Sequence, residues 1–558
     1  MLSPVTESKF RSWLPGAAVI VVITVAALAM GSRLWFFSDD WNIMAGWPSG
    51  RLLEPFNSHL SLVPIAIYQL LFRAFGLESY VPFRVVGLAA YSLLGWATLR
   101  YSRPRVGTWG AALATAAVLW NAAGVTNVMF PFLLNFSLPI AALAAIWWHL
   151  DRADESERPV RDEVIASLWL AVALATSGLG LLTAAAIGVE LLWNRPPLRR
   201  WLVLAPGPAL WVGWYLKYHV DSPPSGGLRP IISYAVRMIW GGFTSLAGQN
   251  EVLGVLLAAA FAMLVLCAGL RWRTFDGRAA GALAAPAVFV VLTAVSRIGV
   301  IPSIPPDELR YQWTVGAFMV LTAVHLCRGR SIDLATDRAA LRQPLIGAGT
   351  AIVAVALVAN AAILWGDMGD WADTVEAAAP GVAANLWAAE QADAAGVLDR
   401  DRALPVSYVK VTAGDYVDAV RELGSPLEGF STDMAASAAE TRKAADQALI
   451  DDFAISVRPL DPGRADDPGC TAVDPQQTPP DHPWRNAILR ITAGKEAVTA
   501  SVSVFGPEGY ATDVGTVAAG ASGLIVLPAV RERSDAFGAD AGYRLTLSGP
   551  AELADCST

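Results

Sequence analysis

Charged residues are scarce in this sequence, and so are cysteine and histidine. Of the 558 residues, 16% are Asp, Glu, Lys or Arg, four are Cys and five are His. The His and Cys residues show no tight spacing, which argues against a dedicated zinc site. The formal net charge of -8 comes largely from the region after Asp367, so nothing favours a nucleic-acid partner. We find no internal repeat, heptad array or low-complexity block.

Hydrophobic residues, by contrast, are abundant. They make up 54% of the chain, which includes 21 Trp, and they are concentrated in repeated long runs before about Trp365. About 20 apolar residues suffice to cross the hydrocarbon core of a bilayer. The composition therefore predicts a polytopic α-helical membrane protein. The first run, 15–37, is longer than the apolar part of a usual signal peptide, so we expect it to be retained.

The Lys and Arg residues test the number of crossings, because short cytoplasmic loops should hold most of them. The segment 59–76 decides this test. If it does not cross the membrane but lies as a helix in the outer membrane interface, all basic loops fall on the cytoplasmic side. The N-terminus is then cytoplasmic and the tail extracytoplasmic. About eleven crossings are predicted, at 15–37, 81–99, 107–122, 126–150, 164–177, 179–193, 201–217, 252–270, 279–300, 311–327 and 345–365.

Two of these spans, 164–177 and 179–193, are short and meet at Ser177-Gly178. Both flanks are basic, so the pair should enter the membrane and return. Backbone that stops partway is tolerated only where it is buried in protein or lines a wet cavity. We expect this pair to border such a cavity.

The composition changes abruptly after Trp365. Residues 1–366 form the predicted transmembrane domain, with a first outer loop at 38–80, and are followed by a mixed α/β region at 367–451 and a β-rich domain at 452–558. Helices are predicted at 370–401, 413–423 and 434–449, a strand at 404–411, and a β-sandwich from the alternating runs 487–491, 498–505, 523–527 and 543–547. Because Cys470 and Cys556 both lie in the extracytoplasmic tail, we predict that they form a disulfide.

Two adjacent acids, Asp39 and Asp40, follow the first apolar run in the segment Ser38-Asp39-Asp40-Trp41. They emerge at a bilayer surface, where a membrane enzyme needs a base that faces a lipid-borne substrate. The structural alternative is that both acids only cap the helix that follows, since Asp is a favoured N-cap residue.

Several further segments accompany this pair in a familiar order. They are Glu54-Pro55-Phe56-Asn57-Ser58-His59-Leu60-Ser61-Leu62-Val63-Pro64, Phe75-Gly76-Leu77-Glu78-Ser79-Tyr80, Ala175-Thr176-Ser177-Gly178-Leu179-Gly180 and Leu309-Arg310-Tyr311. From about Pro15 to Trp365 the chain resembles integral-membrane glycosyltransferases of the GT-C superfamily. The resemblance implies a first-loop aspartate as catalytic base, interfacial helices in that loop, a polyprenyl-phosphate sugar donor and inversion at the anomeric carbon. It favours Asp39 as the base, with Asp40 a close second.

A phosphate leaving group requires cations. Arg310, next to Tyr311 at the start of a span, could bind a donor phosphate through paired hydrogen bonds, or reach lipid headgroups. Arg51, Lys217, Arg229 and Arg237 are also placed outside, against the charge bias; headgroup contact is the simpler explanation for the last two. Glu54 and His59 are candidate substrate contacts or loop-orienting residues, while Trp41, Trp47 and Tyr80 could stack on sugar rings or anchor the interface. Asp307 and Glu308 could pair with Arg310.

The function predicted from the sequence is a plasma-membrane glycosyltransferase of the bacterial cell envelope. It would move a hexose or pentose from a polyprenyl-phosphate donor to an extracytoplasmic glycan, lipid or protein acceptor. No metal ligands are assigned, although a divalent metal ion is left open as a cofactor. The alternatives are a transporter or flippase of lipid-linked sugars, which would favour ionisable groups near mid-membrane, and a non-catalytic sugar-binding membrane protein.

Overall fold

The computed structural model describes residues 12–46, 52–218, 227–298, 304–330, 344–406, 410–428, 439–460, 469–473, 483–484, 486–505, 511–528 and 542–557. Contacts divide the chain into two compact units. The helical unit comprises Met1–Arg33, Arg51–Leu70 and Val81–Ala372, and the mixed unit comprises Leu34–Gly50, Leu71–Tyr80 and Asp373–Thr558. The first outer loop of the sequence thus contributes to both units.

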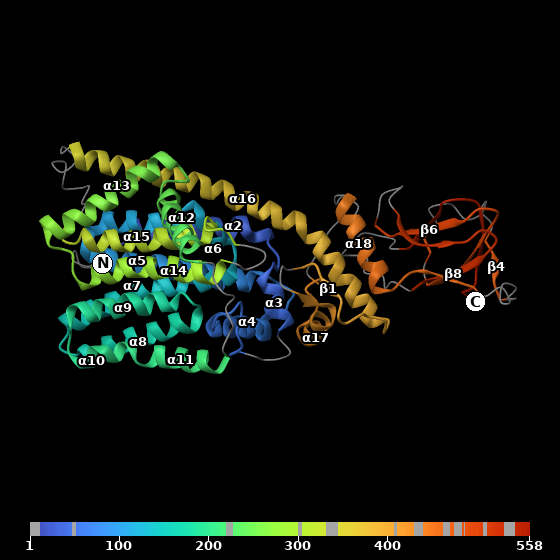
Figure 1. Ribbon diagram of the computed structural model, residues 1–558, viewed down its shortest axis with the longest axis horizontal. Coiled ribbons are helices and arrows are strands. Elements are labelled where there is room, and N and C mark those ends of the chain that lie inside the picture. Colours follow the sequence, from blue (N-terminus) through green and yellow to red (C-terminus); the bar gives the residue numbers. More distant parts are fainter. Residues whose placement is uncertain are drawn as a thin grey trace, which may run out of the picture. The chain divides into compact units, whose positions relative to one another are not determined.

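Long apolar helices build the helical unit. In Figure 1, α5, α14 and α15 lie side by side, and α15 contacts both of the others. The helices with residues in this unit are α2 (Leu14–Met30), α4 (Leu62–Phe75), α5 (Val81–Leu119), α6 (Val125–Met129), α7 (Leu134–Glu155), α8 (Pro159–Thr176), α9 (Gly180–Asn194), α10 (Leu198–Trp201), α11 (Pro206–Tyr218), α12 (Leu228–Leu246), α13 (Glu251–Cys267), α14 (Gly277–Arg297), α15 (Leu309–Leu326) and α16 (Pro344–Ala394).

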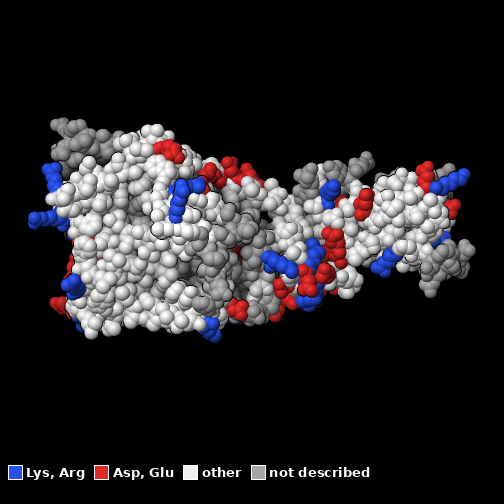
Figure 2. Space-filling model, viewed as in Figure 1, with Lys and Arg blue, Asp and Glu red and all other residues white. Residues whose placement is uncertain are grey.

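Within the described residues, six helical stretches are long and apolar enough to cross a membrane. They are Leu14–Arg33, Val81–Leu119, Pro131–Glu155, Glu251–Trp272, Gly277–Arg297 and Ile352–Ala394. Many of their large side chains point outward, and Leu270 is 84% exposed. Figure 2 shows that the visible flank of the helical unit is largely free of charged side chains. The chain therefore has the helices of a multi-pass membrane protein, as the composition predicts.

The spans predicted at 81–99 and 107–122 correspond to two helical segments, together labelled α5, which are separated by a kink where Gly107 adopts φ 75° and ψ -177°. A positive φ of this kind is readily adopted only by glycine. By contrast, the span predicted at 345–365 and the helix predicted at 370–401 form one helix, α16, which ends at Ala394.

The segment predicted to lie in the interface is a helix that is too short to cross. Its helical part, α4, has 14 residues, or about 21 Å at 1.5 Å per residue. A hydrocarbon core is about 30 Å thick. The predicted hairpin of two short spans is also present as α8 and α9. Any Cβ on Gly180 would lie 2.4 Å from backbone atoms of Leu174, so these helices approach too closely for a side chain there.

The basic loops that the sequence places on one side meet at one end of the helical unit. Arg105 and Arg278 both pair with Asp151, and Arg278 also pairs with Glu190 at 2.9 Å. Pairs of Arg200 with Asp154 and of Arg328 with Asp276 join further loops to this end. In Figure 2, Lys and Arg stand out at the left end of this unit. The loops in which the sequence concentrates its arginines therefore lie together in the structure.

The mixed unit combines helices with one two-stranded sheet and two larger antiparallel sheets. Its other helices are α3 (Asp39–Ala45), α17 (Ala413–Leu423) and α18 (Ala439–Asp452). One of the larger sheets has the strand order β3-β8-β5-β10-β4 and the other β7-β6-β9. The strands are β3 (Val457–Pro459), β4 (Thr471–Ala472), β5 (Ala487–Ala493), β6 (Val498–Ser503), β7 (Thr512–Val517), β8 (Ser522–Leu527), β9 (Arg544–Leu547) and β10 (Ala551–Asp555).

Alternating burial explains how these sheets pack. Along β5, Leu489 and Ile491 are fully buried, whereas Ile488, which precedes them, is 37% exposed. Period-two alternation of this kind is the signature of a strand with one face in a core. A Cβ on Gly515 of β7 would lie 3.1 Å from Cβ of Val457 on β3, so the two sheets are in direct contact. The strand-rich C-terminal region predicted from the sequence is therefore present.

The prediction of a single strand at 404–411 is wrong. This segment contributes to two short strands, β1 (Ala403–Leu404) and β2 (Val411–Thr412), which pair antiparallel, so the chain reverses between them. Apolar alternation cannot reveal such a reversal. The helix predicted at 413–423 coincides with α17, where Thr412 accepts a capping hydrogen bond from the Asp415 amide. The helix predicted at 434–449 begins in the structure at Ala439; residues 434–438 lie outside the described part of the chain.

The predicted disulfide between Cys470 and Cys556 is confirmed. It closes a segment of 86 residues that contains most of both sheets. Cross-linking such a segment stabilises a fold mainly by restricting the unfolded chain.

We expect Cys470→Ser to lower the free energy of unfolding of the mixed unit by about 2–4 kcal/mol. Thermal unfolding with and without reductant measures this loss, with Cys267→Ser, a free cysteine in α13, as the matched control. Thiol titration of the denatured protein should give two thiols without reductant and four with it. Four thiols in both conditions would contradict the disulfide.

Candidate functional site

The two acids of the first loop stand at the start of α3 in the mixed unit. Ser38 precedes them with φ 50° and ψ -108° and occupies the N-cap position, although its side chain makes no capping bond. Asp39 is 5% exposed and Asp40 is 0% exposed. Ser38 is thus the N-cap residue, although the Asp40 side chain accepts a hydrogen bond from the Phe37 amide just before the helix, as a capping acid can. Burying a carboxylate is costly unless hydrogen bonds compensate for the lost water.

Hydrogen-bond donors replace the water that the buried Asp40 carboxylate has lost. The hydroxyl of Tyr80 donates to Asp40 Oδ2 over 2.7 Å, and the amide of Phe37 donates to the same oxygen over 3.0 Å. Charge-assisted hydrogen bonds of this length are among the stronger ones in proteins. Asp40 thus joins the beginning of the loop to its end, 40 residues later.

Aromatic rings surround this carboxylate. The rings of Phe36 and Tyr80 lie 4.9 Å apart, and those of Phe36 and Trp41 lie 5.6 Å apart. Trp41 is only 1% exposed. Tyr80 and Trp41, which the sequence offered as sugar-stacking or interface residues, are thus packed inside the loop, and Tyr80 holds Asp40.

Elements of the C-terminal region contact this loop within the mixed unit. Helix α3 packs against α17 and β2. Gly76, at φ 61°, approaches the end of α17 so closely that a Cβ would lie 2.7 Å from the carbonyl oxygen of Leu423. The tail, whose role the sequence leaves undefined, therefore forms part of the surroundings of the aspartate pair.

His59 lies in the helical unit at the end of a tight turn. Asn57 and Ser58 both have positive φ, at 49° and 66°, and the backbones of Phe56 and His59 exchange two hydrogen bonds. This is the backbone pattern of a type I′ turn. The turn presents the imidazole to the α8–α9 connection, where a Cβ on Gly178 would lie 3.2 Å from His59 Nδ1. Two of the motifs quoted from the sequence thus meet.

Burial, followed by the positive charge of Arg297, lowers the pKa of His59 from 6.5 to about 4. The imidazole is therefore neutral near pH 7. A neutral imidazole can accept or donate a hydrogen bond, but it cannot supply a positive charge to a phosphate. Arg297 was not selected from the sequence; its place at the outer end of a predicted span, against the charge bias, was the available signal.

Arg310 is three-quarters buried, at 24% side-chain exposure, in the first turn of α15. Its nearest carboxylate is Glu308, whose Oε1 lies 3.7 Å from Nε. This buried Nε has no hydrogen-bond partner among the residues that the structure describes. The other acid offered as a partner, Asp307, pairs instead with Arg237 at 3.0 Å. Tyr311 is buried and packs its ring edge-to-face on Phe289.

The remaining predicted contacts are less distinctive. Glu54 and Lys217 are exposed, and Lys217 Nζ lies 5.0 Å from the ring centre of Tyr218. Arg51 and Trp47 lie outside the described residues. The structure therefore groups Asp39 and Asp40 with Tyr80 in the mixed unit, and brings His59 to Gly178 in the helical unit. Among the described residues, no three His, Cys, Asp or Glu side chains are placed to hold a metal ion.

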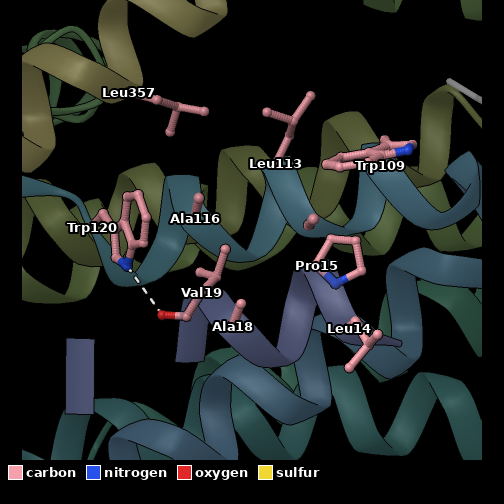
Figure 3. A pocket seen from close by; sticks show the side chains of 10 residues that line it. Leu14, Pro15, Ala18, Val19, Trp109, Leu113, Ala116, Trp120 and Leu357 are labelled. Carbon is pink, nitrogen blue, oxygen red and sulfur yellow. Dashed lines mark hydrogen bonds between the residues drawn. The ribbon is translucent and has the colours of Figure 1, made fainter. Parts of the chain in front are cut away.

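An apolar cavity of about 460 Å³ lies between α2, α5 and α16 in the helical unit (Figure 3). The indole nitrogen of Trp120 donates to the carbonyl of Val19 at its edge, 3.2 Å away. None of the predicted site residues lines it. The lining residues are Leu14, Pro15, Ala18, Val19, Trp109, Ala112, Leu113, Ala116, Trp120 and Leu357.

Arg84 is a buried charge that the sequence analysis passed over. It is 3% exposed, and its guanidinium donates to backbone carbonyls of Ala27, Val128 and Met129. These carbonyls belong to the last turns of α2 and α6, where unsatisfied C=O groups attract cations. An arginine near the start of an otherwise apolar span was the signal, because such charges are rarely without a role.

We compared the whole chain with known proteins. No family model, no curated protein and no solved structure gives a significant match.

The lowered pKa of His59 predicts that acid weakens this fold. The unfolded chain takes up the proton near pH 6.5 and the folded chain only near pH 4, so the free energy of unfolding should fall as pH drops between these values. Above about pH 6.5 this group should have no effect. Thermal unfolding of wild type and His59→Gln in detergent, followed by tryptophan fluorescence, measures the difference in slope.

A variant next to the imidazole provides the control. Gly178→Val crowds the ring and should reduce the same slope, whereas Gly188→Ala in α9, where a Cβ has its nearest neighbour at 4.0 Å, should leave it unchanged. Identical slopes for wild type and His59→Gln would contradict the burial of a neutral imidazole.

Proposed function

We propose that this chain is an integral-membrane glycosyltransferase that moves a sugar from a polyprenyl-phosphate donor to an extracytoplasmic acceptor. The observation that carries the proposal is the buried pair Asp39 and Asp40, directly after the first apolar helix, with Asp40 held by Tyr80. Buried acids in a special arrangement are typical of functional sites. The order of sequence motifs that resembles the GT-C superfamily supports the same conclusion.

We assign the two acids different tasks. The Tyr80 hydroxyl and Phe37 amide bind Asp40, which suits it to positioning the turn. Asp39, held in the same turn, is the base that the resemblance to the GT-C superfamily favours. In the proposed step the acceptor hydroxyl gives its proton to Asp39 and its oxygen bonds to the anomeric carbon. The bond from that carbon to the phosphate oxygen breaks, and the phosphate leaves with the electron pair, so the configuration inverts.

Arg310, in the helical unit, is the proposed contact for the donor phosphate. Its buried Nε lacks a hydrogen-bond partner among the described residues, and the distance of 3.7 Å to Glu308 is long for an ion pair. A guanidinium can bind two phosphate oxygens at once. The apolar cavity at α2, α5 and α16 offers a surface for a lipid chain such as that of the donor.

The number of membrane crossings and the orientation of the chain are further parts of the proposal. We propose about eleven crossings in a GT-C-like arrangement, a cytoplasmic N-terminus and an extracytoplasmic tail whose two sheets form a β-sandwich. The gathering of basic loops at one end of the helical unit supports the orientation, since such loops favour the cytoplasm. The disulfide in the tail supports an oxidising compartment.

Replacing the base should abolish transfer without unfolding the protein. We expect Asp39→Asn to lower kcat roughly 100- to 10,000-fold, the usual range for losing a general base. Tyr80→Phe should lower it less, roughly 10- to 100-fold, because Asp40 loses a hydrogen-bond donor and the turn shifts. The assay follows release of polyprenyl phosphate from polyprenyl-phosphate hexoses and pentoses, with cell-envelope glycan as acceptor.

Thermal unfolding of each variant separates lost chemistry from lost folding. Full activity of both Asp39→Asn and Asp40→Asn would remove the base assignment. Movement of an intact polyprenyl-phosphate sugar across vesicle membranes, without transfer, would favour a transporter instead.

Arg310 should affect donor binding more than turnover. We expect Arg310→Gln to raise the donor KM roughly 10-fold or more, as removal of a charge-assisted hydrogen bond does, and Arg310→Lys to recover part of the loss. Arg237→Gln is the matched control, because Arg237 is exposed and pairs with Asp307. Equal KM values for wild type and Arg310→Gln would contradict a phosphate contact.

A further inference from the structure

A second group of arginines, away from the proposed chemistry, lacks the partners that other arginines at the same end possess. Arg105, Arg200, Arg278 and Arg328 each pair with a carboxylate. Among the described residues, no carboxylate lies within ion-pair distance of Arg100 or Arg103. Both belong to α5, at the end of the helical unit where the basic loops meet.

Tryptophan rings hold these cations instead. The guanidinium carbon of Arg100 lies 4.3 Å from the ring centre of Trp148, 5.3 Å from that of Trp13 and 5.7 Å from that of Trp96. Arg103 lies 4.1 Å from the ring centre of Trp13 and also donates a hydrogen bond to Ser12 Oγ. Stacking on an aromatic face stabilises a cation but uses none of its five N–H donors.

Arg152 brings a third positive charge to the same rings. Its guanidinium carbon is 5.2 Å from the ring centre of Trp148, the ring that Arg100 also faces. Its carboxylate partner, Asp162, lies at 3.5 Å and is shared with His149. Arg100, Arg103 and Arg152 thus all lie against the rings of Trp13 and Trp148. The carboxylate near these three cations is that of Asp162, which also pairs with His149.

A cavity of about 160 Å³ opens beside Arg100 between α5, α7 and α8. Its floor consists of small buried residues, Ala97, Ala141 and Ala145. Trp96, Trp148 and Trp169 form its walls. A narrow apolar groove with a cationic end matches one hydrocarbon chain that carries an anionic headgroup.

We propose that this cavity binds an anionic glycerophospholipid of the adjacent leaflet, with its phosphodiester on Arg100 and one acyl chain along the alanine floor. Basic pockets between membrane helices bind lipid headgroups in this way. The three clustered guanidiniums select against zwitterionic lipids, because the ammonium group of such a headgroup would meet like charges. The site is independent of the proposed transfer reaction and contains none of its residues.

Native mass spectrometry of the full-length, delipidated protein in detergent tests this site. Dioleoyl phosphatidylglycerol and dioleoyl phosphatidylcholine, which share their acyl chains, are titrated separately. We expect the first phosphatidylglycerol to bind at least roughly 10-fold more tightly than phosphatidylcholine, a difference of about 1.4 kcal/mol. Arg100→Gln should remove that preference, and Arg100→Lys should restore part of it.

Matched variants separate the cavity from general surface charge. Arg271→Gln removes an exposed arginine of the same end and should leave the preference intact. Ala145→Leu keeps all three arginines but narrows the cavity, and it should weaken binding even if Arg100→Gln fails to fold. Equal losses in Arg271→Gln and Arg100→Gln, or unchanged binding in Ala145→Leu, would overturn the proposal. Displacement of the lipid by equimolar glycerol 3-phosphate would also overturn it, by indicating a site for soluble phosphate.

Discussion

The hydrogen bond from Tyr80 to Asp40 is the constraint on which the candidate site depends. A carboxylate with no exposure to water is tolerated only where donors replace that water. The donors come from the two ends of the first loop, Phe37 and Tyr80, so the bond that stabilises Asp40 also closes the loop. Because Asp39 precedes Asp40 in the same helical turn, its direction follows from this closure. Packing of α3 against α17 and β2 supports the loop from the C-terminal region.

The few charged side chains of the helical unit also depend on partners that replace water. Arg278 is buried against two carboxylates and Arg84 against backbone carbonyls at two helix ends, whereas the partly exposed Arg100 lies against tryptophan rings. Carboxylates and carbonyl oxygens occupy the N–H donors of a guanidinium, whereas aromatic rings leave its edge available. This difference distinguishes Arg278 and Arg84, which donate hydrogen bonds to oxygen atoms, from Arg100, which lies over tryptophan rings.

The sequence predicted the helices and strands better than the contacts between residues that are distant in the chain. The helices at α4, α8, α9 and α17 follow from apolar spacing, which is a local property of the chain. The reversal between β1 and β2 was missed because a short apolar run reads the same whether or not it turns. The surroundings of the two acids could not be predicted for a related reason: no local pattern indicates that Tyr80, 40 residues away, donates a hydrogen bond to Asp40.

By itself, the sequence determined that this is a multi-pass helical membrane protein with a strand-rich tail, because hydrophobic length and alternation act along the chain. It also determined the pairing of Cys470 with Cys556, since the tail contains no other cysteine. Only the tertiary structure decided that Tyr80 binds Asp40, that Gly178 receives His59 and that three tryptophans surround Arg100. Apart from the contact of Arg100 with Trp96 in the same helix, these contacts join residues far apart in sequence, and their free energies depend on distances and burial that exist only after the helices have packed.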